Sequence, residues 1–312
     1  MKIAIIGAGA MGSLFGGLLS DKCEVCLYST NTSYVEAVNT NGLIMTQGDK
    51  KYVKKVRATN KAEEIGTSDV AVIFVKCTGT EKAIQDAMVS SINKDTIVVT
   101  LQNGIGNVDI IKKFVPEDQI VYGYTTLTSD RVAPGHIEMT TIKEVDTHLC
   151  PISDSVMPKL IQFIDSLNAV GLNASIPNDI DEKIWYKLMV NASENTLCSI
   201  FKINVSQLMI QTRESFEIAK QVIYEVSDVA RAKGINISRE KALEHVMKVT
   251  RSVPEHVPSM VLDIVNKKKT EISSLNEAVV KEGKELGIPT PINGMIVNII
   301  RTIEKNYDKT ID

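Results

Sequence analysis

The sequence predicts an α/β protein in which a doubly wound parallel-sheet domain, residues 1–177, precedes an all-helical domain, residues 178–312. In the first half, short apolar runs rich in β-branched residues alternate with amphipathic stretches. This is the pattern of parallel strands that are buried on both faces and joined by helices. After about residue 177, nearly every segment has helical periodicity instead. A length of 312 residues suits two domains of about 100–200 residues each.

The apolar runs of the first half give the expected strands, because each run is short and bounded by residues that favour turns. They lie at residues 3–6, 25–28, 70–75, 96–101 and 120–122. Helical patterns lie between them, for instance at residues 12–20 and 80–92.

The helices expected in the second half have recognisable ends. Gly234 and Gly287 stand where C-terminal caps belong, and Ser238 and Ser273 suit N-caps. Glycine adopts the left-handed conformation that ends many helices, and a serine hydroxyl accepts a hydrogen bond from a free backbone N–H. The expected helices are residues 179–196, 215–233, 238–251, 259–266, 273–286 and 291–305.

Composition excludes several classes of protein. The chain is 44% apolar and 23% charged with a net charge of −3, which argues against disorder and gives no general attraction to nucleic acid or to an anionic membrane. No stretch approaches the ~20 apolar residues that span a bilayer, and the five scattered cysteines do not form a disulfide framework. The four histidines show no metal-ligand spacing. We therefore expect a soluble cytoplasmic protein without a metal site.

A glycine motif follows the first expected strand and opens the first expected helix. The run Gly7-Ala8-Gly9-Ala10-Met11-Gly12 has the form G-x-G-x-x-G. The first glycine allows the tight turn, the second lets the backbone approach a pyrophosphate, and the third allows close packing of helix and strand. The helix N-terminus supplies free N–H groups for the phosphates. We therefore expect a Rossmann-type dinucleotide site formed by these six residues.

The end of the second expected strand bears on which dinucleotide binds. An acidic residue there bonds the ribose hydroxyl of NAD, whereas basic or small polar groups accept NADP. The sequence offers Tyr28-Ser29-Thr30-Asn31, without carboxylate or arginine. This favours NADP, with Thr30 as a contact, and leaves NAD open.

One helix of the second half carries polar residues on an otherwise apolar surface. Lys187, Asn191 and Asn195 are four residues apart, so a regular helix places them on one stripe. Burying a lysine is costly unless it is paired or neutralised, which favours a functional stripe. A solvated polar face on a half-exposed helix is the alternative.

Further polar residues stand alone as weaker signals. Lys76 and Asn103 follow expected strands, at the sheet edge where ligands bind in open α/β folds. Ser259 and Asp263 share one helix face, and Glu271 follows a basic run. By itself, the sequence position of Glu271 indicates a surface carboxylate.

Taken together, these motifs resemble the ketopantoate reductase family (2-dehydropantoate 2-reductase) over essentially the whole chain. Besides the glycine motif, the resemblance rests on Val75-Lys76, Gln102-Asn103-Gly104-Ile105-Gly106, Trp185-x-Lys187-Leu188-x-Val190-Asn191-x-x-x-Asn195, Ser259-Met260-x-x-Asp263-Ile264, Thr270-Glu271-Ile272 and Gly287-Ile288-x-x-Pro291.

The resemblance implies a reaction and a role for each site residue. In this family NADPH delivers hydride to the C2 ketone of ketopantoate, giving pantoate for pantothenate and coenzyme A biosynthesis, with the substrate in a cleft between two lobes. Lys187 would be the general acid that protonates the carbonyl oxygen. The remaining roles are substrate binding for Asn191, Asn195 and Ser259, a place beside the nicotinamide ribose and Lys187 for Glu271, and the lining of the dinucleotide cleft for Lys76, Ser129 and Asn103, the last also facing the substrate.

The sequence departs from the family pattern at three places. Ser29-Thr30 stands where the family often has an arginine for the 2′-phosphate, Asn204 is one position early for a substrate-binding asparagine, and Glu194 is an unusual charge inside the Lys187 helix. A related 2-keto or 3-hydroxy acid dehydrogenase and a non-enzymatic dinucleotide sensor therefore remain alternatives. A homodimer and feedback by coenzyme A are also left open.

Overall fold

The computed structural model describes residues 1–140 and 146–309. Its contacts divide the chain into two compact units. The first unit consists of Met1–Gln102 and Asn107–Ile180. The second unit consists of the chain from Asp181 onward together with the short segment Asn103–Gly106. The sequence placed the division after residue 177 and assigned all of the earlier residues to one domain. A four-residue segment of the first half is thus part of the second unit.

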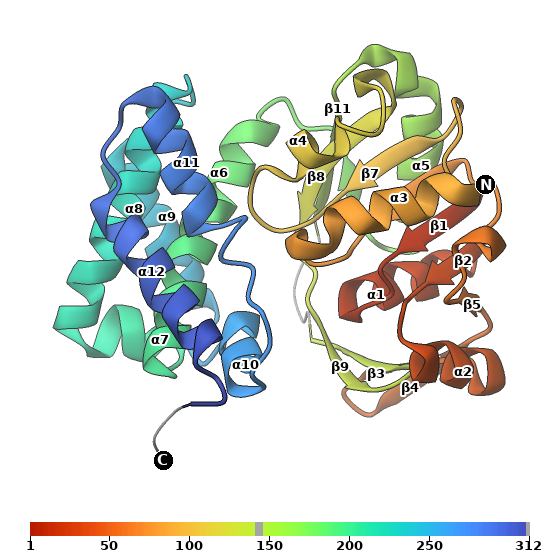
Figure 1. The fold of residues 1–312 in the computed structure, drawn as a ribbon, viewed down its shortest axis with the longest axis horizontal. Helices are drawn as coiled ribbons and strands as arrows, with labels where there is room; N and C mark the ends of the chain where they lie inside the picture. Colours follow the sequence, from red (N-terminus) through yellow and green to blue (C-terminus); the bar gives the residue numbers. More distant parts are fainter. Residues whose placement is uncertain (141–145, 310–312) are drawn as a thin grey trace. The chain divides into compact units, whose positions relative to one another are not determined.

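The first unit is built on an eight-stranded sheet in the order β12-β11-β8-β7-β6-β1-β2-β5 (Figure 1). β8 and β11 pair antiparallel, and the other neighbours pair parallel. Each expected strand is confirmed. The bounds are β1 (Lys2–Ile6), β2 (Glu24–Tyr28), β5 (Arg57–Thr59), β6 (Val70–Ile73), β7 (Ile97–Thr100), β8 (Ile120–Thr125), β11 (Thr147–Pro151) and β12 (Ala174–Ser175).

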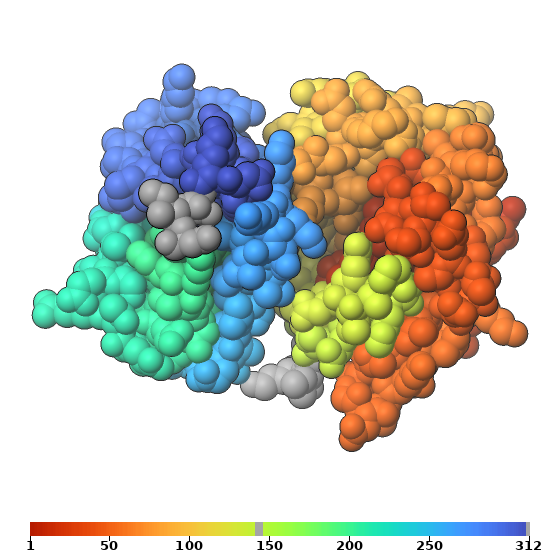
Figure 2. Space-filling model, turned by 60° about the horizontal axis from the view of Figure 1, so that its bottom comes forward, coloured from red at the N-terminus to blue at the C-terminus, as the bar shows by residue number. Residues whose placement is uncertain are grey.

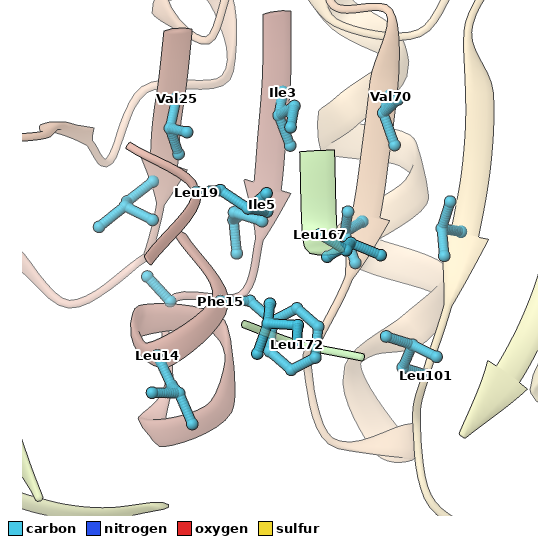
Figure 3. Packing of buried hydrophobic residues seen from close by; sticks show 14 of the residues in the cluster. Ile3, Ile5, Leu14, Phe15, Leu19, Val25, Val70, Leu101, Leu167 and Leu172 are labelled. Atoms are coloured by element: carbon cyan, nitrogen blue, oxygen red, sulfur yellow. The ribbon is translucent and has the colours of Figure 1, made fainter. Parts of the chain in front are cut away.

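Strand β1 is buried on both faces because helices cover both sides of the sheet. Ile3 and Ile5 belong to one apolar cluster, while Ala4 and Ile6, which point the other way, belong to another. Helices α1 (Ala10–Leu19), α2 (Thr32–Asn41) and α5 (Met157–Asn168) supply the first cluster, and α3 (Thr80–Ser90) and α4 (Asn107–Ile111) the second. Figure 3 shows Phe15 of α1 packed among the strand residues of the first cluster. Full burial of one such side chain is worth about 1.5–3 kcal/mol.

The order of the strands creates the place where a ligand binds in this class of fold. From β1 the chain forms β2 on one side and then returns to form β6 on the other. The loops that follow β1 and β6 therefore diverge at the carboxyl ends of the strands, which is the topological switch point. The glycine turn lies there.

A second, four-stranded sheet in the order β4-β3-β10-β9 was not predicted. Its strands are β3 (Leu43–Gln47), β4 (Lys50–Lys54), β9 (Ser129–Ala133) and β10 (His136–Met139). β4 and β9 are almost wholly exposed and lack an apolar run, so the sequence gives little strand signal there. Figure 2 shows β9 and β10 (yellow-green) against the orange strands β3 and β4 of the same unit.

The second unit is helical, as expected, and packs around one apolar cluster. Ser238 caps α9 through its side chain, and Gly287 ends α11 in the left-handed conformation, which confirms both predictions. The helices are α6 (Ile180–Val190), α7 (Thr196–Phe201), α8 (Arg213–Ala232), α9 (Arg239–Ser252), α10 (Ser259–Val265), α11 (Asn276–Leu286) and α12 (Pro291–Lys305), with π-helical segments at Asn191–Asn195 and Gln207–Gln211.

The prediction that Ser273 caps a helix is wrong. Helix α11 begins at Asn276, after Leu275. The N–H groups of Ser274 and Leu275 bond back to the carbonyls of Glu271 and Ile272, so a separate turn occupies the residues that were expected to start the helix. Of the helices within residues 1–140 and 146–309, none is both long enough and apolar enough to cross a membrane.

Candidate functional site

The glycine turn of the first unit has the geometry that its motif predicts. Gly7 has a φ of +103°, and a Cβ placed there would lie 2.6 Å from the backbone nitrogen of Val75. A Cβ at Gly12 would lie 2.2 Å from the carbonyl oxygen of Gly7. The N–H groups of Gly7 and Ala8 both donate to the carbonyl of Tyr28, at 3.0 Å. A side chain at either glycine would therefore break the turn.

Gly9 differs because the space beside it is open. A Cβ at Gly9 would approach only the Arg131 guanidinium, whose Nη2 would lie 3.8 Å away. Gly9 is also the N-cap of α1, and no side chain among the described residues caps that helix. Uncapped N–H groups carry a partial positive charge. Free backbone donors, open space and a nearby cation fit the diphosphate of a dinucleotide.

Strand β9 adds two polar groups on one of its faces. Ser129, predicted as a cofactor contact, begins the strand, and Arg131 follows two residues later, so both side chains point to the same side. The Ser129 hydroxyl is buried and has no hydrogen-bond partner among the described residues. β9 packs against α1. The sequence reasoning missed Arg131 because it missed the strand, whose period of two would have joined Arg131 to Ser129.

Two other predicted cofactor contacts are exposed. Thr30 follows β2, and Lys76 follows β6 at the N-cap of a short 3₁₀ turn, Cys77–Gly79. Beside Thr30, the Asn31 side chain accepts from the Tyr34 N–H and caps α2. Asn31 is therefore engaged in the fold, as is Ser29, whose hydroxyl accepts from the Asn31 N–H. Thr30 is exposed beside them.

In the second unit, Lys187 is half-buried on α6, whose neighbours Trp185, Leu188 and Met189 belong to the core. Burial lowers the pKa of Lys187 from 10.5 to about 8, and the nearby Glu271 carboxylate offsets part of this fall. An ammonium with a pKa near 8 remains mostly protonated at neutral pH. It also gives up its proton more readily than an ordinary lysine, which suits a general acid.

Glu271 and Asn103 meet although 168 residues separate them. The Asn103 side-chain nitrogen donates to a Glu271 carboxylate oxygen at 3.3 Å. The Asn103–Gly106 segment is fixed by Ile105, whose N–H donates to the Ser274 carbonyl at 2.9 Å. Gly104 has a φ of +82°, and a Cβ there would lie 2.0 Å from the same carbonyl oxygen. Glycine is thus required at position 104. The structure brings three predicted residues, Lys187, Glu271 and Asn103, into one group.

The expectation of one regular helix over residues 179–196 is wrong in one respect. The turn at Asn191–Asn195 is π-helical, so Asn195 does not stack above Asn191 as it would in an α-helix. Hydroxyl groups satisfy the carbonyls around this turn. Ser193 donates to Met189, Thr196 to Ala192 and Ser199 to Asn195, and Asn276 of α11 also donates to Ala192. These side-chain hydrogen bonds compensate for the backbone hydrogen bonds that the π-helical turn lacks relative to an α-helix.

Apart from Asn103, the predicted substrate-binding residues lie on this turn and on α10, which packs against it. Asn191 is 8% exposed, and its side-chain nitrogen has no hydrogen-bond partner in the described part of the chain. A buried amide donor without a partner costs free energy unless a ligand accepts from it. Asn195 is half-buried, and Ser259 is exposed at the start of α10.

The structure assigns Asn204 to helix capping. Its side-chain oxygen Oδ1 accepts from the Gln207 N–H at 2.9 Å, its backbone N–H donates to the Gln207 side chain, and its side-chain nitrogen donates to Glu255 at 3.0 Å. These bonds commit the side chain to the loop that precedes the second π-helical segment.

Comparison with known proteins agrees with this geometry. Residues 3–149 match the family model described as "Ketopantoate reductase PanE/ApbA", and residues 179–304 match its C-terminal counterpart. Proteins named 2-dehydropantoate 2-reductase from Streptococcus pyogenes serotype M3 and Lactococcus lactis are 30% and 29% identical. The first alignment covers 97% of this chain and 98% of the relative, and the second covers 98% of each.

Solved structures give the same family. A D-mandelate dehydrogenase in complex with NADH and anilino(oxo)acetate superimposes with a TM-score of 0.92 at 30% identity, covering 99% of this chain and all of that one. A PanE/ApbA family ketopantoate reductase from Ralstonia eutropha JMP134 has a TM-score of 0.88 at 26% identity, with the same coverage. By sequence along nearly its whole length and by fold, this chain belongs to the ketopantoate reductase family of oxidoreductases.

Proposed function

We propose that this protein reduces the C2 ketone of ketopantoate to the alcohol of pantoate, with NADPH as the hydride donor, and so serves pantothenate and coenzyme A biosynthesis. The observation that carries the proposal is Lys187, a half-buried amine with a pKa of about 8 beside the Glu271 carboxylate. We assign dinucleotide binding to the first domain, residues 1–177, and substrate binding and catalysis to the helical domain, residues 178–312.

Lys187 supplies what the reaction needs on the ketone oxygen. A bound reduced nicotinamide supplies the hydride, and negative charge then develops on that oxygen. The Lys187 ammonium stabilises the charge and donates the proton that completes the alcohol. Glu271 favours the protonated amine between turnovers, and the Asn103 side-chain nitrogen donates a hydrogen bond to the Glu271 carboxylate.

The substrate contacts come from the turn that follows Lys187. The Asn191 side-chain nitrogen, which has no partner within the described residues, is a donor for the carboxylate or hydroxyl oxygen of a 2-keto acid. Asn195 and Ser259 provide further hydrogen bonds to the same polar groups of the acid. Contacts of this kind hold the ketone oxygen within reach of Lys187, and such positioning is a large part of enzymatic rate enhancement.

The choice of NADPH rests on the turn after β2, which has no carboxylate that would repel a 2′-phosphate. Arg131 lies beside Gly9, at the diphosphate position that NADH and NADPH share. We assign Arg131 to a phosphate group of the dinucleotide, because a guanidinium makes paired hydrogen bonds to phosphate oxygens. Lys76, Thr30 and Ser129 complete the proposed contacts.

A second candidate is a reductase of 2-keto acids with a bulky apolar substituent, using NADH. Asn204 favours it, since this asparagine is committed to Gln207 and Glu255 and does not remain available for the hydroxyl group that distinguishes ketopantoate. The D-mandelate dehydrogenase carries NADH and a 2-oxo acid amide at 30% identity to this chain.

The test is a matrix of two cofactors and several acids. Purified protein is mixed with NADPH or NADH and with ketopantoate, phenylglyoxylate or pyruvate, and loss of the reduced-nicotinamide absorbance is followed. The proposal expects the highest kcat/KM for NADPH with ketopantoate. A preference for phenylglyoxylate with NADH would establish the second candidate, and dinucleotide binding without oxidation by any acid would indicate a sensor.

A further inference from the structure

A buried carboxyl group lies in the π-helical turn beside the proposed substrate contacts. Glu194 stands between Asn191 and Asn195 and is 3% exposed. Its Oε1 lies 2.5 Å from the hydroxyl oxygen of Thr250 on α9. A charge in such a place is costly unless it is paired, and among the described residues the hydrogen-bond partner of the Glu194 carboxyl is this neutral hydroxyl.

The hydrogen-bond count around Thr250 indicates which form of Glu194 fits. The Thr250 hydroxyl oxygen lies 2.5 Å from Glu194 and 3.0 Å from the Val246 carbonyl oxygen one turn earlier. A hydroxyl has one proton to donate. With an ionised Glu194, one of these two acceptors receives no proton. With a protonated Glu194, the carboxyl donates to Thr250 and Thr250 donates to Val246, so both contacts become hydrogen bonds.

The surroundings favour the neutral form as well. Burial raises the pKa of Glu194 from 4.5 to about 7, and the Thr250 bond offsets this only in part. A titratable neighbour is Cys198, one turn further along, whose pKa is raised to about 12 by burial and by Glu194. The buried residues that α8 and α10 contribute to the core are apolar or carry hydroxyl groups, so neither helix supplies a buried cation.

Glu194 also has a mechanical consequence for the turn. The hydroxyl groups of Ser193 and Thr196 bond to carbonyls of their own helix. Glu194 instead connects the turn to α9, while Asn276 connects the Ala192 carbonyl to α11. The π-helical turn is thus attached on two sides, and the two asparagines of the proposed substrate site lie next to the Glu194 attachment.

We propose that Glu194 is a positioning residue that acts as a neutral carboxylic acid and, through Thr250, fixes the turn that presents Asn191 and Asn195 to the 2-keto acid. The inference rests on the proposed reduction of a 2-keto acid. It predicts that an uncharged hydrogen-bonding group serves equally well at this position, whereas an apolar group of similar size does not.

Three variants test it: Glu194→Gln, Glu194→Leu and Thr250→Val. We expect Glu194→Gln to keep the KM for the keto acid within about twofold of the native value. The other two variants should raise this KM by about tenfold, since each removes one hydrogen bond to the turn, while kcat changes less and the dinucleotide Kd stays unchanged. Thr250→Val is nearly isosteric and remains informative if Glu194→Leu does not fold.

Denaturant unfolding between pH 5 and pH 8 tests the protonation state without any substrate. The protonated carboxyl is favoured in the folded state, so the native protein should lose stability relative to Glu194→Gln as the pH rises from 5 to about 7, and this loss should level off above pH 7. Glu214→Gln, at an exposed position on α8, is the matched control and should show no such trend. A native KM in both Glu194→Leu and Thr250→Val, or a Glu194→Gln protein as impaired as Glu194→Leu, overturns the proposal. If the native protein reduces no 2-keto acid, the proposed function fails, and the unfolding series still decides whether Glu194 is neutral.

Discussion

The glycine turn of the first unit and the Lys187 helix of the second differ in the kind of polar group that is available to a ligand. At the glycine turn, no side chain of the described residues caps α1, and Gly9 itself brings none, so backbone N–H groups are available where a ligand would approach. At the Lys187 helix, Ser193, Thr196 and Asn276 satisfy the irregular backbone, and the available groups are side chains. Substitutions that add a side chain should therefore impair the glycine turn, whereas substitutions that remove a polar side chain should impair the Lys187 helix.

The largest effect is expected from removing the Lys187 amine. Lys187→Ala should lower kcat by at least about a hundredfold, because general acid catalysis contributes about 10²–10⁴-fold. Dinucleotide binding, measured by titration, should be unchanged because the glycine turn belongs to the other unit. Lys241→Ala, at an exposed position on α9, is the control. Near-native turnover in Lys187→Ala would remove Lys187 from the mechanism.

Two neighbouring glycines separate the cost of conformation from the cost of close approach. Gly104 and Gly106 have φ angles of +82° and +88°, but a Cβ would meet the Ser274 carbonyl at Gly104 and nothing within 4 Å at Gly106. Gly106→Ala should cost about 1–2 kcal/mol in the free energy of unfolding for conformation alone. Gly104→Ala should cost about 1–3 kcal/mol more for overpacking.

Gly104→Ala should also lower kcat/KM, because it displaces Asn103 from Glu271, whereas Gly106→Ala should not. Chemical denaturation and steady-state kinetics of both proteins provide the measurement. Equal losses of stability in the two variants would contradict the close approach at Gly104.

A smaller effect is expected at the glycine turn when Arg131 is removed. Arg131→Ala should weaken dinucleotide binding by about tenfold, the loss of one charge-assisted contact, with kcat at saturating cofactor nearly unchanged. The binding should also become less dependent on salt concentration. Lys50→Ala, at an exposed position on strand β4 of the same sheet, is the control. Unchanged affinity for both NADPH and NADH would exclude Arg131 from the site.

The same contrast explains how much the sequence could predict. Five strands of the large sheet, β1, β2, β6, β7 and β8, were predicted because runs such as Val70–Ile73 are buried on both faces, and the glycine turn because its steric needs are local. The short or outlying strands β5, β11 and β12 of the same sheet were not predicted. The small sheet was missed because β9 has almost no apolar signal, and Arg131 was missed with it. The π-helical turn was missed because the sequence around Asn191 keeps helical periodicity, and the hydroxyl groups that bond to its carbonyls are identified only by the hydrogen bonds of the structure.

The pairing of Asn103 with Glu271 lay beyond local reasoning because the two residues are far apart in the sequence. Their roles came from the family resemblance. Likewise, Glu194 had no explanation until the structure placed it against Thr250. Long-range contacts of single polar groups are thus the part of this site that sequence patterns do not contain.

The pH dependence of kcat/KM, measured in both directions, tests the central role of Lys187 most directly. Reduction needs the protonated amine, so its kcat/KM should fall tenfold per unit as the pH rises beyond the Lys187 pKa of about 8. Oxidation of the 2-hydroxy acid needs the neutral amine, so its kcat/KM should rise through the same pKa and then level off. Profiles that remain flat between pH 7 and pH 10 in both directions would contradict proton transfer by Lys187.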